Sequence, residues 1–324
     1  MFERNRAGRR DGSSDLTHLA APTRRTVYMA HCAQSSLRTA RWSVGIAGAA
    51  AALIGAFWLA AWMAGFAARW SAAGVITVKT NMALALLLAG PSLVLLGLDK
   101  STPRRRWVGG LAAALVLLIG SLTLSEHLFG YGLGIDQLLA SEPAGAAATV
   151  SPNRIGPPGA TCLTLLGIAL LALAWERRRP VPYLGLAVCL IALVPLVGFL
   201  YGIHEFYGTA RLTGIAWSTV LAMLWLGAGL MLTRPEVGLV AQLLRKDPDG
   251  VVFRRMFPAA LLLPLALGYL HVQGERWGLY DQTTGAGLLA IALALAFSAM
   301  LCYSGISLRK QAEEQIQSLA RFPE

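Results

Sequence analysis

The chain has 324 residues, of which 56% are hydrophobic and only 14% are charged, and its formal net charge is +11. A soluble domain carries about 25% charged residues, so the composition excludes an ordinary soluble globular fold. Apolar runs of about 20 residues, the length that crosses the hydrocarbon core of a bilayer, recur along the sequence. The composition therefore indicates an all-α integral membrane protein.

Residues 1–42 are polar and rich in arginine, and they show no helical periodicity. We predict that they form a disordered basic tail. A polar region of this length differs from the short start of a cleavable signal peptide, so the first apolar run is predicted to be an uncleaved anchor. The membrane domain is expected over residues 43–305.

Eight apolar runs in this domain are long enough to be membrane-spanning helices. They cover about residues 44–67, 82–98, 107–129, 160–175, 182–202, 215–233, 257–273 and 286–305. Of the 28 Lys and Arg residues, 23 lie in the N-terminal tail, in alternate connections and in the C-terminal segment. Because basic residues concentrate on the cytoplasmic side, we predict a bacterial inner-membrane protein with both termini in the cytoplasm. The positive charge thus indicates topology and not a nucleic-acid partner.

Two segments of the chain have glycine, aromatic and glutamate residues at the same spacing. The stretches "GFLYGIHEFYG" (198–208) and "GYLHVQGERWG" (268–278) place Glu205 and Glu275 at matching points. Residues 81–98, 159–175 and 219–235 also resemble one another. We predict four helical hairpins in series. The alternative, that Leu-, Ala- and Gly-rich spans match through composition alone, stays open.

Polar side chains gather at the predicted outer ends of alternate spans, where they share one leaflet. Such side chains suit an outward pocket for a small polar or cationic ligand. The residues predicted to line this pocket are Asp136, His204, Glu205, Tyr207, Glu275, Trp277 and Asp281. Polar helix ends and interfacial aromatic residues also occur without any ligand, and this alternative stays open.

The sequence contains no Walker motif, nucleophile elbow or dinucleotide fingerprint, so no catalytic residue is predicted. His127, His204 and His271 lack the i, i+4 spacing that puts two metal ligands on one helix face,. No metal or cofactor is therefore predicted, and a metal or haem enzyme is a minor alternative. Ionisable residues are missing from the middles of the spans, which disfavours a transporter. A small hairpin-repeat permease is retained as the main alternative.

The charged segment 306–324 is predicted to extend the last span as a cytoplasmic signalling helix. Its apolar residues Leu308, Ala312, Ile316 and Leu319 are spaced 4, 4 and 3 apart, which makes one stripe along a helix. We predict that this stripe pairs two copies in a short coiled coil and transmits a signal. The alternative is an amphipathic helix on the inner leaflet.

The stretches "GYGLGIDQLL", "YGIHEFYG", "GERWGLYD" and "AEEQIQSLARFPE" resemble the N-terminal membrane sensor region of bacterial PAS-containing sensor histidine kinases, or of diguanylate cyclases. The resemblance covers about residues 106–324. It implies a sensory input module of a two-component system, with a PAS and output domain after the signalling helix and a response regulator as partner. Phosphotransferase activity would lie in that output domain. The phosphoacceptor histidine and ATP-binding residues of the family are not matched here, so none is assigned.

Overall fold

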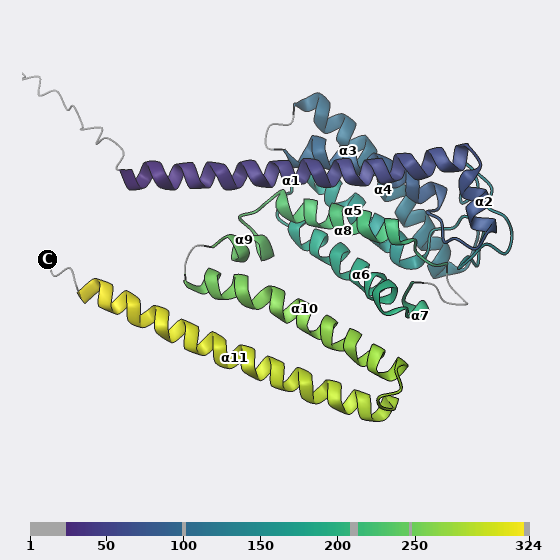
Figure 1. Cartoon of the computed structure of the whole chain (residues 1–324). Coiled ribbons are helices and arrows are strands. Elements are labelled where there is room, and N and C mark those ends of the chain that lie inside the picture. Colours follow the sequence, from purple (N-terminus) through teal and green to yellow (C-terminus); the bar gives the residue numbers. More distant parts are fainter. Residues whose placement is uncertain (1–23, 99–101, 208–212, 246–247, 321–324) are drawn as a thin grey trace, which may run out of the picture. The chain divides into compact units, whose positions relative to one another are not determined.

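The computed structural model describes residues 24–98, 102–207, 213–245 and 248–320, and the regular secondary structure of these residues is all helical. The helices are α1 (Arg24–Met63), α2 (Phe66–Ala72), α3 (Thr80–Gly97), α4 (Pro103–Phe129), α5 (Pro157–Ala174), α6 (Val181–Tyr201), α7 (His204–Tyr207), α8 (Trp217–Leu232), α9 (Gly238–Leu244), α10 (Pro248–Arg276) and α11 (Gln282–Ala320). Figure 1 shows them in chain order. By its contacts the chain divides after Arg38, and the packing described below concerns residues from Thr39 onward.

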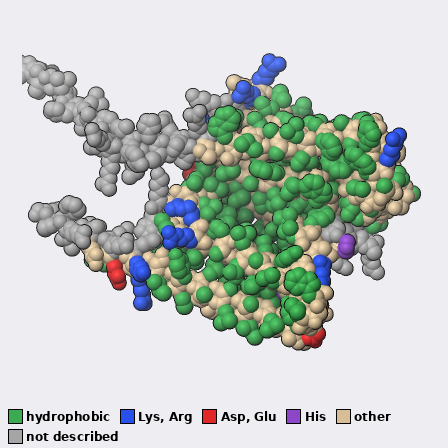
Figure 2. Space-filling view, in the orientation of Figure 1, with side chains coloured by type: hydrophobic (Ala, Val, Ile, Leu, Met, Phe, Trp, Pro, Cys, Tyr) green, Lys and Arg blue, Asp and Glu red, His purple; other side chains and the backbone are tan. Residues whose placement is uncertain are grey.

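Seven of the helices are long and apolar enough to cross a membrane, and α8 is a shorter apolar helix of 16 residues. Hydrophobic side chains cover most of the face seen in Figure 2, and charged side chains are few. These helices give the chain the dimensions and surface of a membrane protein. The predicted all-helical membrane fold is therefore confirmed at this level, and each of the eight predicted runs coincides with one of these helices.

The ends of the helices differ from the predicted ones for local reasons. Helix α4 begins at Pro103 and not near 107, because the Thr102 hydroxyl accepts a hydrogen bond from the Arg105 backbone nitrogen at 3.4 Å. Proline is also well suited to the first helical position. At the other boundary, α1 stops at Met63, and Gly65 adopts a left-handed backbone with φ 75° before α2 starts.

The structure describes part of the predicted irregular tail as a helix. Helix α1 starts at Arg24, so residues 24–42 are helical and not an irregular tail. This segment contains Ala, Arg, Leu, Met and Gln, which favour helices, and it has neither Gly nor Pro. The remainder of the predicted tail, residues 1–23, lies outside the described residues.

Three pairs of helices pack closely through glycines. In each pair, a Cβ on one glycine would clash with the facing helix: Gly55 with the Ala83 carbonyl at 2.6 Å (α1 and α3), Gly120 with the Thr164 backbone nitrogen at 2.6 Å (α4 and α5), and Gly185 with the Gly227 carbonyl at 2.6 Å (α6 and α8). Small residues let the backbones of membrane helices approach in this way. The three pairs are therefore α1–α3, α4–α5 and α6–α8.

The second helix of each pair also has the same internal register. Each begins ten residues before a glycine that faces the first helix: Thr80 and Gly90 in α3, Pro157 and Gly167 in α5, Trp217 and Gly227 in α8. The residue before each helix has an extended backbone of closely similar angles, with φ −66°, −66° and −72° and ψ 149°, 158° and 144°. The chain thus enters these three helices in one conformation.

A hydrogen bond recurs at this entry in two of the pairs. The Trp62 indole nitrogen donates to the Val78 carbonyl at 2.7 Å. His127 Nε2 lies 2.7 Å from the Ile155 carbonyl, where the ring nitrogen has to be the donor,. Val78 and Ile155 each stand two residues before the start of the following helix. Each bond ties the end of one helix to the start of its partner.

Helices α10 and α11 form an antiparallel hairpin (Figure 1). Beyond this pairing, α10 contacts α6 and α9. In the most apolar stretch of α11 only 6% of the residues are buried, compared with 67% for α3. Helix α11 continues unbroken from Gln282 to Ala320, so it extends past the last predicted apolar run, which ends at about residue 305.

The two segments with matching sequence do not share one backbone. Gly202 ends α6 in a left-handed conformation with φ 67°, and the short helix α7 follows. The aligned residue in the other segment, Val272, lies inside α10, which runs on to Arg276. A β-branched residue does not readily adopt positive φ. Glu205 therefore follows a helix end, whereas Glu275 lies within a helix.

Candidate functional site

The loop of residues 130–156, between α4 and α5, is held in place by buried charged side chains. The Lys79 ammonium lies 2.6 and 2.7 Å from the two carboxylate oxygens of Glu142. Thr149 accepts a third hydrogen bond from Lys79 at 2.7 Å, and the Ser71 hydroxyl donates to Glu142 at 2.8 Å. The Lys79 and Glu142 side chains are 5% and 0% exposed. The only charged group between Arg69 and α3 is therefore neutralised by a residue of the loop.

Asn153 joins this ion pair to the start of α3. Its backbone nitrogen donates to Glu142 at 2.5 Å, and its side-chain amide donates to the Thr80 hydroxyl at 2.6 Å and to the Ala140 carbonyl at 2.8 Å. Its amide oxygen accepts from the Thr80 backbone nitrogen at 3.0 Å. Asn153 has φ 57°, a left-handed conformation that asparagine tolerates better than most residues. One residue thus satisfies polar groups of the loop and of a helix N-terminus.

Arg154 holds the other part of the loop. Its Nε lies 2.8 Å from an Asp136 carboxylate oxygen, and one terminal nitrogen lies 3.2 Å from Glu126. Glu126 also accepts a hydrogen bond from the Leu133 backbone nitrogen at 2.6 Å. We call the whole set the loop network: Ser71, Lys79, Thr80, Glu126, Asp136, Glu142, Thr149, Asn153 and Arg154.

The loop network contains more acid than base, because three carboxyl groups face two basic groups. The second carboxylate oxygens of Glu126 and Asp136 are buried and have no hydrogen-bond partner within the described part of the chain. Burial lowers the pKa of Lys79 from its usual range, and the Glu142 carboxylate offsets this effect only in part,. Buried ion pairs of this kind are sensitive to the loss of either member.

The space beside the network is too small for an organic ligand. A cavity of about 10 Å³ lies against Lys79, lined also by Thr77, Met82, Ile155 and Thr219. A volume of about 10–15 Å³ accommodates a single water molecule. The network thus encloses space for about one water molecule and none for an organic ligand,.

The predicted pocket residues fall into two places. Asp136 is in the loop network, where it is paired with Arg154. His204 lies on α7 with an exposed side chain, and Glu205 and Tyr207 lie on the same helix, although their side chains are outside the described residues. Glu275 is exposed in the last turn of α10, and Trp277 and Asp281 are exposed in the connection between α10 and α11.

Arg276 brings the second group together. Its guanidinium donates to the Tyr201 carbonyl at 2.6 Å, which joins the α10–α11 turn to the last residue of α6. A cation at a helix C-terminus also interacts favourably with the helix dipole. Gly202 leaves room for this contact, since a Cβ there would lie 2.9 Å from the guanidinium. We call this contact the α6–α10 junction; it adjoins α7, and the turn of residues 277–281 follows it.

Asp281 has a structural role at this turn. Its carboxylate accepts from the Thr284 backbone nitrogen at 3.2 Å and its carbonyl from Gly285 at 2.9 Å, so it caps α11,. The hydrogen bonds from Thr284 lower the pKa of Asp281. The cap fixes where the hairpin turns into α11.

Lys79, Glu126, Glu142, Asn153 and Arg154 were not among the predicted site residues. A signal for them is present in the sequence: Lys79 and Arg154 are isolated basic residues on the side predicted to be poor in them, and Glu142 is an isolated acid in an Ala-rich loop. Unpaired charges next to apolar spans are costly, and this cost predicts partners. It does not predict which residues pair.

The described residues contain no group of three or more His, Cys, Asp and Glu side chains that could hold a metal ion. No family model, curated protein or solved structure matches this chain.

Proposed function

We propose that this chain is the membrane-embedded sensory input module of a bacterial signalling protein, with eight spans in four hairpins and both termini on the cytoplasmic side of the inner membrane. The observation that carries the proposal is the length of α11. Its 39 residues extend for about 58 Å at about 1.5 Å per residue,. The hydrocarbon core is only about 30 Å thick, so the helix projects well beyond it.

The exposed surface of α11 supports a role in association. Leu308 and Ile316, in the predicted stripe, are 40% and 68% exposed. The side chains of Ala312 and Leu319 lie outside the described residues. Within the membrane, Leu295 and Leu301 are also largely exposed. We infer that lipid covers part of this surface and that a second copy of the chain covers the stripe, as in a short parallel coiled coil.

The α6–α10 junction offers a route by which a signal could pass from the end of α6 through the α10–α11 turn to α11. The predicted pocket residues His204, Glu205 and Tyr207 follow Tyr201 on α7, while Glu275 and Trp277 flank Arg276 and Asp281 stands five residues after it. A stimulus that shifts the junction changes the position of the α10–α11 turn, and α11 is one continuous helix from Gln282 to Ala320. Such a shift is a change in the populations of two arrangements.

The remaining parts of the proposal come from the sequence resemblance. They are a PAS and output domain after the signalling helix, with a histidine kinase as the first choice and a diguanylate cyclase as the second, and a response regulator as the cytoplasmic partner. No catalytic residue of a histidine kinase or a diguanylate cyclase is assigned in this chain.

The decisive experiment changes the phase of α11. The full chain is fused after Glu324 to a kinase reporter, and residues are inserted after Lys310. Two inserted alanines rotate the following helix by about 200°, whereas seven rotate it by only about 20° from its original phase. We expect the two-residue insertion to change reporter output at least several-fold and the seven-residue insertion to leave it close to that of the parent.

The permease alternative makes the opposite prediction. Output that is equal for both insertions, combined with flux of a solute into vesicles that also persists after removal of residues 311–324, contradicts the sensory proposal. Cysteine cross-linking provides an independent check in a background lacking the natural cysteines. Cysteines at 308 and 316 should form disulfide dimers, and a cysteine at 313, off the stripe, should not.

A further inference from the structure

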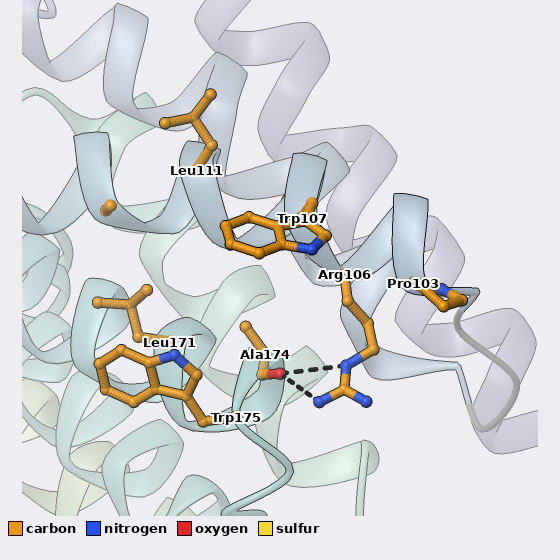
Figure 3. A pocket seen from close by; sticks show the side chains of 9 residues that line it. Pro103, Arg106, Trp107, Leu111, Leu171, Ala174 and Trp175 are labelled. Atoms are coloured by element: carbon orange, nitrogen blue, oxygen red, sulfur yellow. Dashed lines mark hydrogen bonds between the residues drawn. The ribbon is translucent and has the colours of Figure 1, made fainter.

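A second site lies between α4 and α5, away from the loop network. The structure contains a pocket of about 510 Å³ there, lined mainly by Leu111, Leu171, Trp107 and Trp175, with Arg106 at its edge. Figure 3 shows Trp107 projecting from α4 and Trp175 from the end of α5 toward the same space. Ligand sites in proteins have volumes of about 300–1,000 Å³, so this pocket is large enough to hold part of an organic molecule.

The pocket lies where a membrane-spanning helix meets the water interface. Trp107 and Trp175 are 81% and 69% exposed, and exposed tryptophans at the ends of apolar helices are typical of the interface. Deeper in the pocket, Gly110, Ala114 and Leu171 form an apolar wall between two spans. An occupant therefore has an apolar part that follows the helices and a polar part at the tryptophans.

Basic residues adjoin the pocket. Arg106 is the basic residue among those that line it, and the sequences "RRRW" and "WERRR" place Arg104 and Arg105 just before it and Arg177 to Arg179 shortly after Trp175, with Glu176 as the only acid in these two stretches. Arg106 is held in place by the Ala174 carbonyl at 2.9 and 3.2 Å and by Glu176 at 2.6 Å. These contacts use three of the five N–H groups of the guanidinium. The charge at the rim fits an anionic group.

We propose that this pocket binds an anionic phospholipid, with an acyl chain against the apolar wall and the phosphate at Arg106 and the neighbouring arginines. Basic pockets between membrane helices are suited to such headgroups. The choice between a lipid and a free anion follows from the shape of the site, because a free phosphate leaves the apolar volume unfilled. The bound lipid joins α4 to α5 at the end opposite the loop that also connects them.

The test uses the full chain in detergent with phosphatidylglycerol or phosphatidylcholine of identical acyl chains, and native mass spectrometry measures bound lipid. We expect binding of phosphatidylglycerol to be at least tenfold tighter. The variant Arg106→Gln/Trp107→Ala/Trp175→Ala should reduce this preference to less than twofold. The matched control Arg255→Gln/Trp42→Ala/Trp217→Ala alters exposed residues of the same types elsewhere and should retain it.

Equal binding of the two lipids by the unaltered chain, or equal loss of preference in both variants, would overturn the proposal. A measurement on the unaltered chain covers the case in which the first variant does not fold. Brominated phosphatidylglycerol should quench its tryptophan fluorescence at concentrations at least tenfold lower than brominated phosphatidylcholine, because Trp107 and Trp175 line the site. Quenching at equal concentrations of the two lipids also overturns the proposal.

Discussion

Lys79 and Glu142 form a fully enclosed ion pair with N–O distances of 2.6 and 2.7 Å, although 63 residues separate them in the sequence. Lys79 precedes α3, and Glu142 belongs to the loop between α4 and α5. The pair therefore fastens the loop to the residue that precedes α3. Its removal should affect the fold differently depending on whether one member or both are replaced.

Replacement of Lys79 by Met leaves a buried carboxylate without its cation and should lower the free energy of unfolding by about 3–5 kcal/mol. The double variant Lys79→Met/Glu142→Leu should recover most of that loss, because no buried charge is then uncompensated. Chemical unfolding in detergent measures both. As a control, Arg234→Gln breaks an exposed pair with Glu236 and should cost less than about 1 kcal/mol. Additive losses in the double variant contradict this account of the pair.

The stability that depends on Lys79 should rise with pH. Burial lowers the pKa of Lys79 in the folded chain, while the unfolded chain keeps the ordinary value of 10.5. Between these two values the unfolded chain binds more protons than the folded one, so the free energy of unfolding increases with pH through that window. The difference in unfolding free energy between the parent and Lys79→Met, followed from pH 7 to pH 10.5, isolates this effect from other groups. If the difference falls with pH, the Glu142 carboxylate affects the pKa of Lys79 more than burial does, and the predicted direction is wrong.

Two Gly→Ala substitutions should have opposite signs. In Gly120→Ala the new Cβ meets the Thr164 backbone nitrogen at 2.6 Å, and such overpacking costs about 1–3 kcal/mol. In Gly45→Ala nothing lies within 4 Å, and alanine stabilises a helix interior by about 0.5–1 kcal/mol relative to glycine. Thermal unfolding in one detergent compares them. Equal changes in unfolding temperature for the two variants would contradict the close packing of α4 against α5.

Arg276→Gln should loosen the α6–α10 junction, because glutamine lacks the charge and the reach of the guanidinium that contacts the Tyr201 carbonyl. Hydrogen exchange at the backbone amides of residues 198–203 should become several-fold faster, with α3 unchanged as an internal reference. In the kinase fusion, the same variant should shift reporter output. Faster exchange with unchanged output separates a structural role of the junction from a signalling role.

The helices could be predicted from the sequence, and the sites could not, for physical reasons. A span is a local property: about 20 consecutive apolar residues are enough to indicate α6 or α10. The partner of Lys79 is a long-range property, since Glu142 reaches Lys79, and Asn153 reaches the adjacent Thr80, only once α3, α4 and α5 are packed. The sequence match between the segments around Glu205 and Glu275 failed for a local reason, because Gly202 allows a helix end that Val272 does not.

The enclosed pair also has a consequence for the order of events during synthesis. Lys79 leaves the ribosome 63 residues before Glu142, a delay of roughly 3–13 s at about 5–20 residues per second. During that interval its ammonium has to stay in contact with water or lipid headgroups. The first two apolar helices can therefore insert early, but their final packing waits for the loop between the next two. A nascent chain that stalls before residue 142 therefore holds Lys79 without its carboxylate partner.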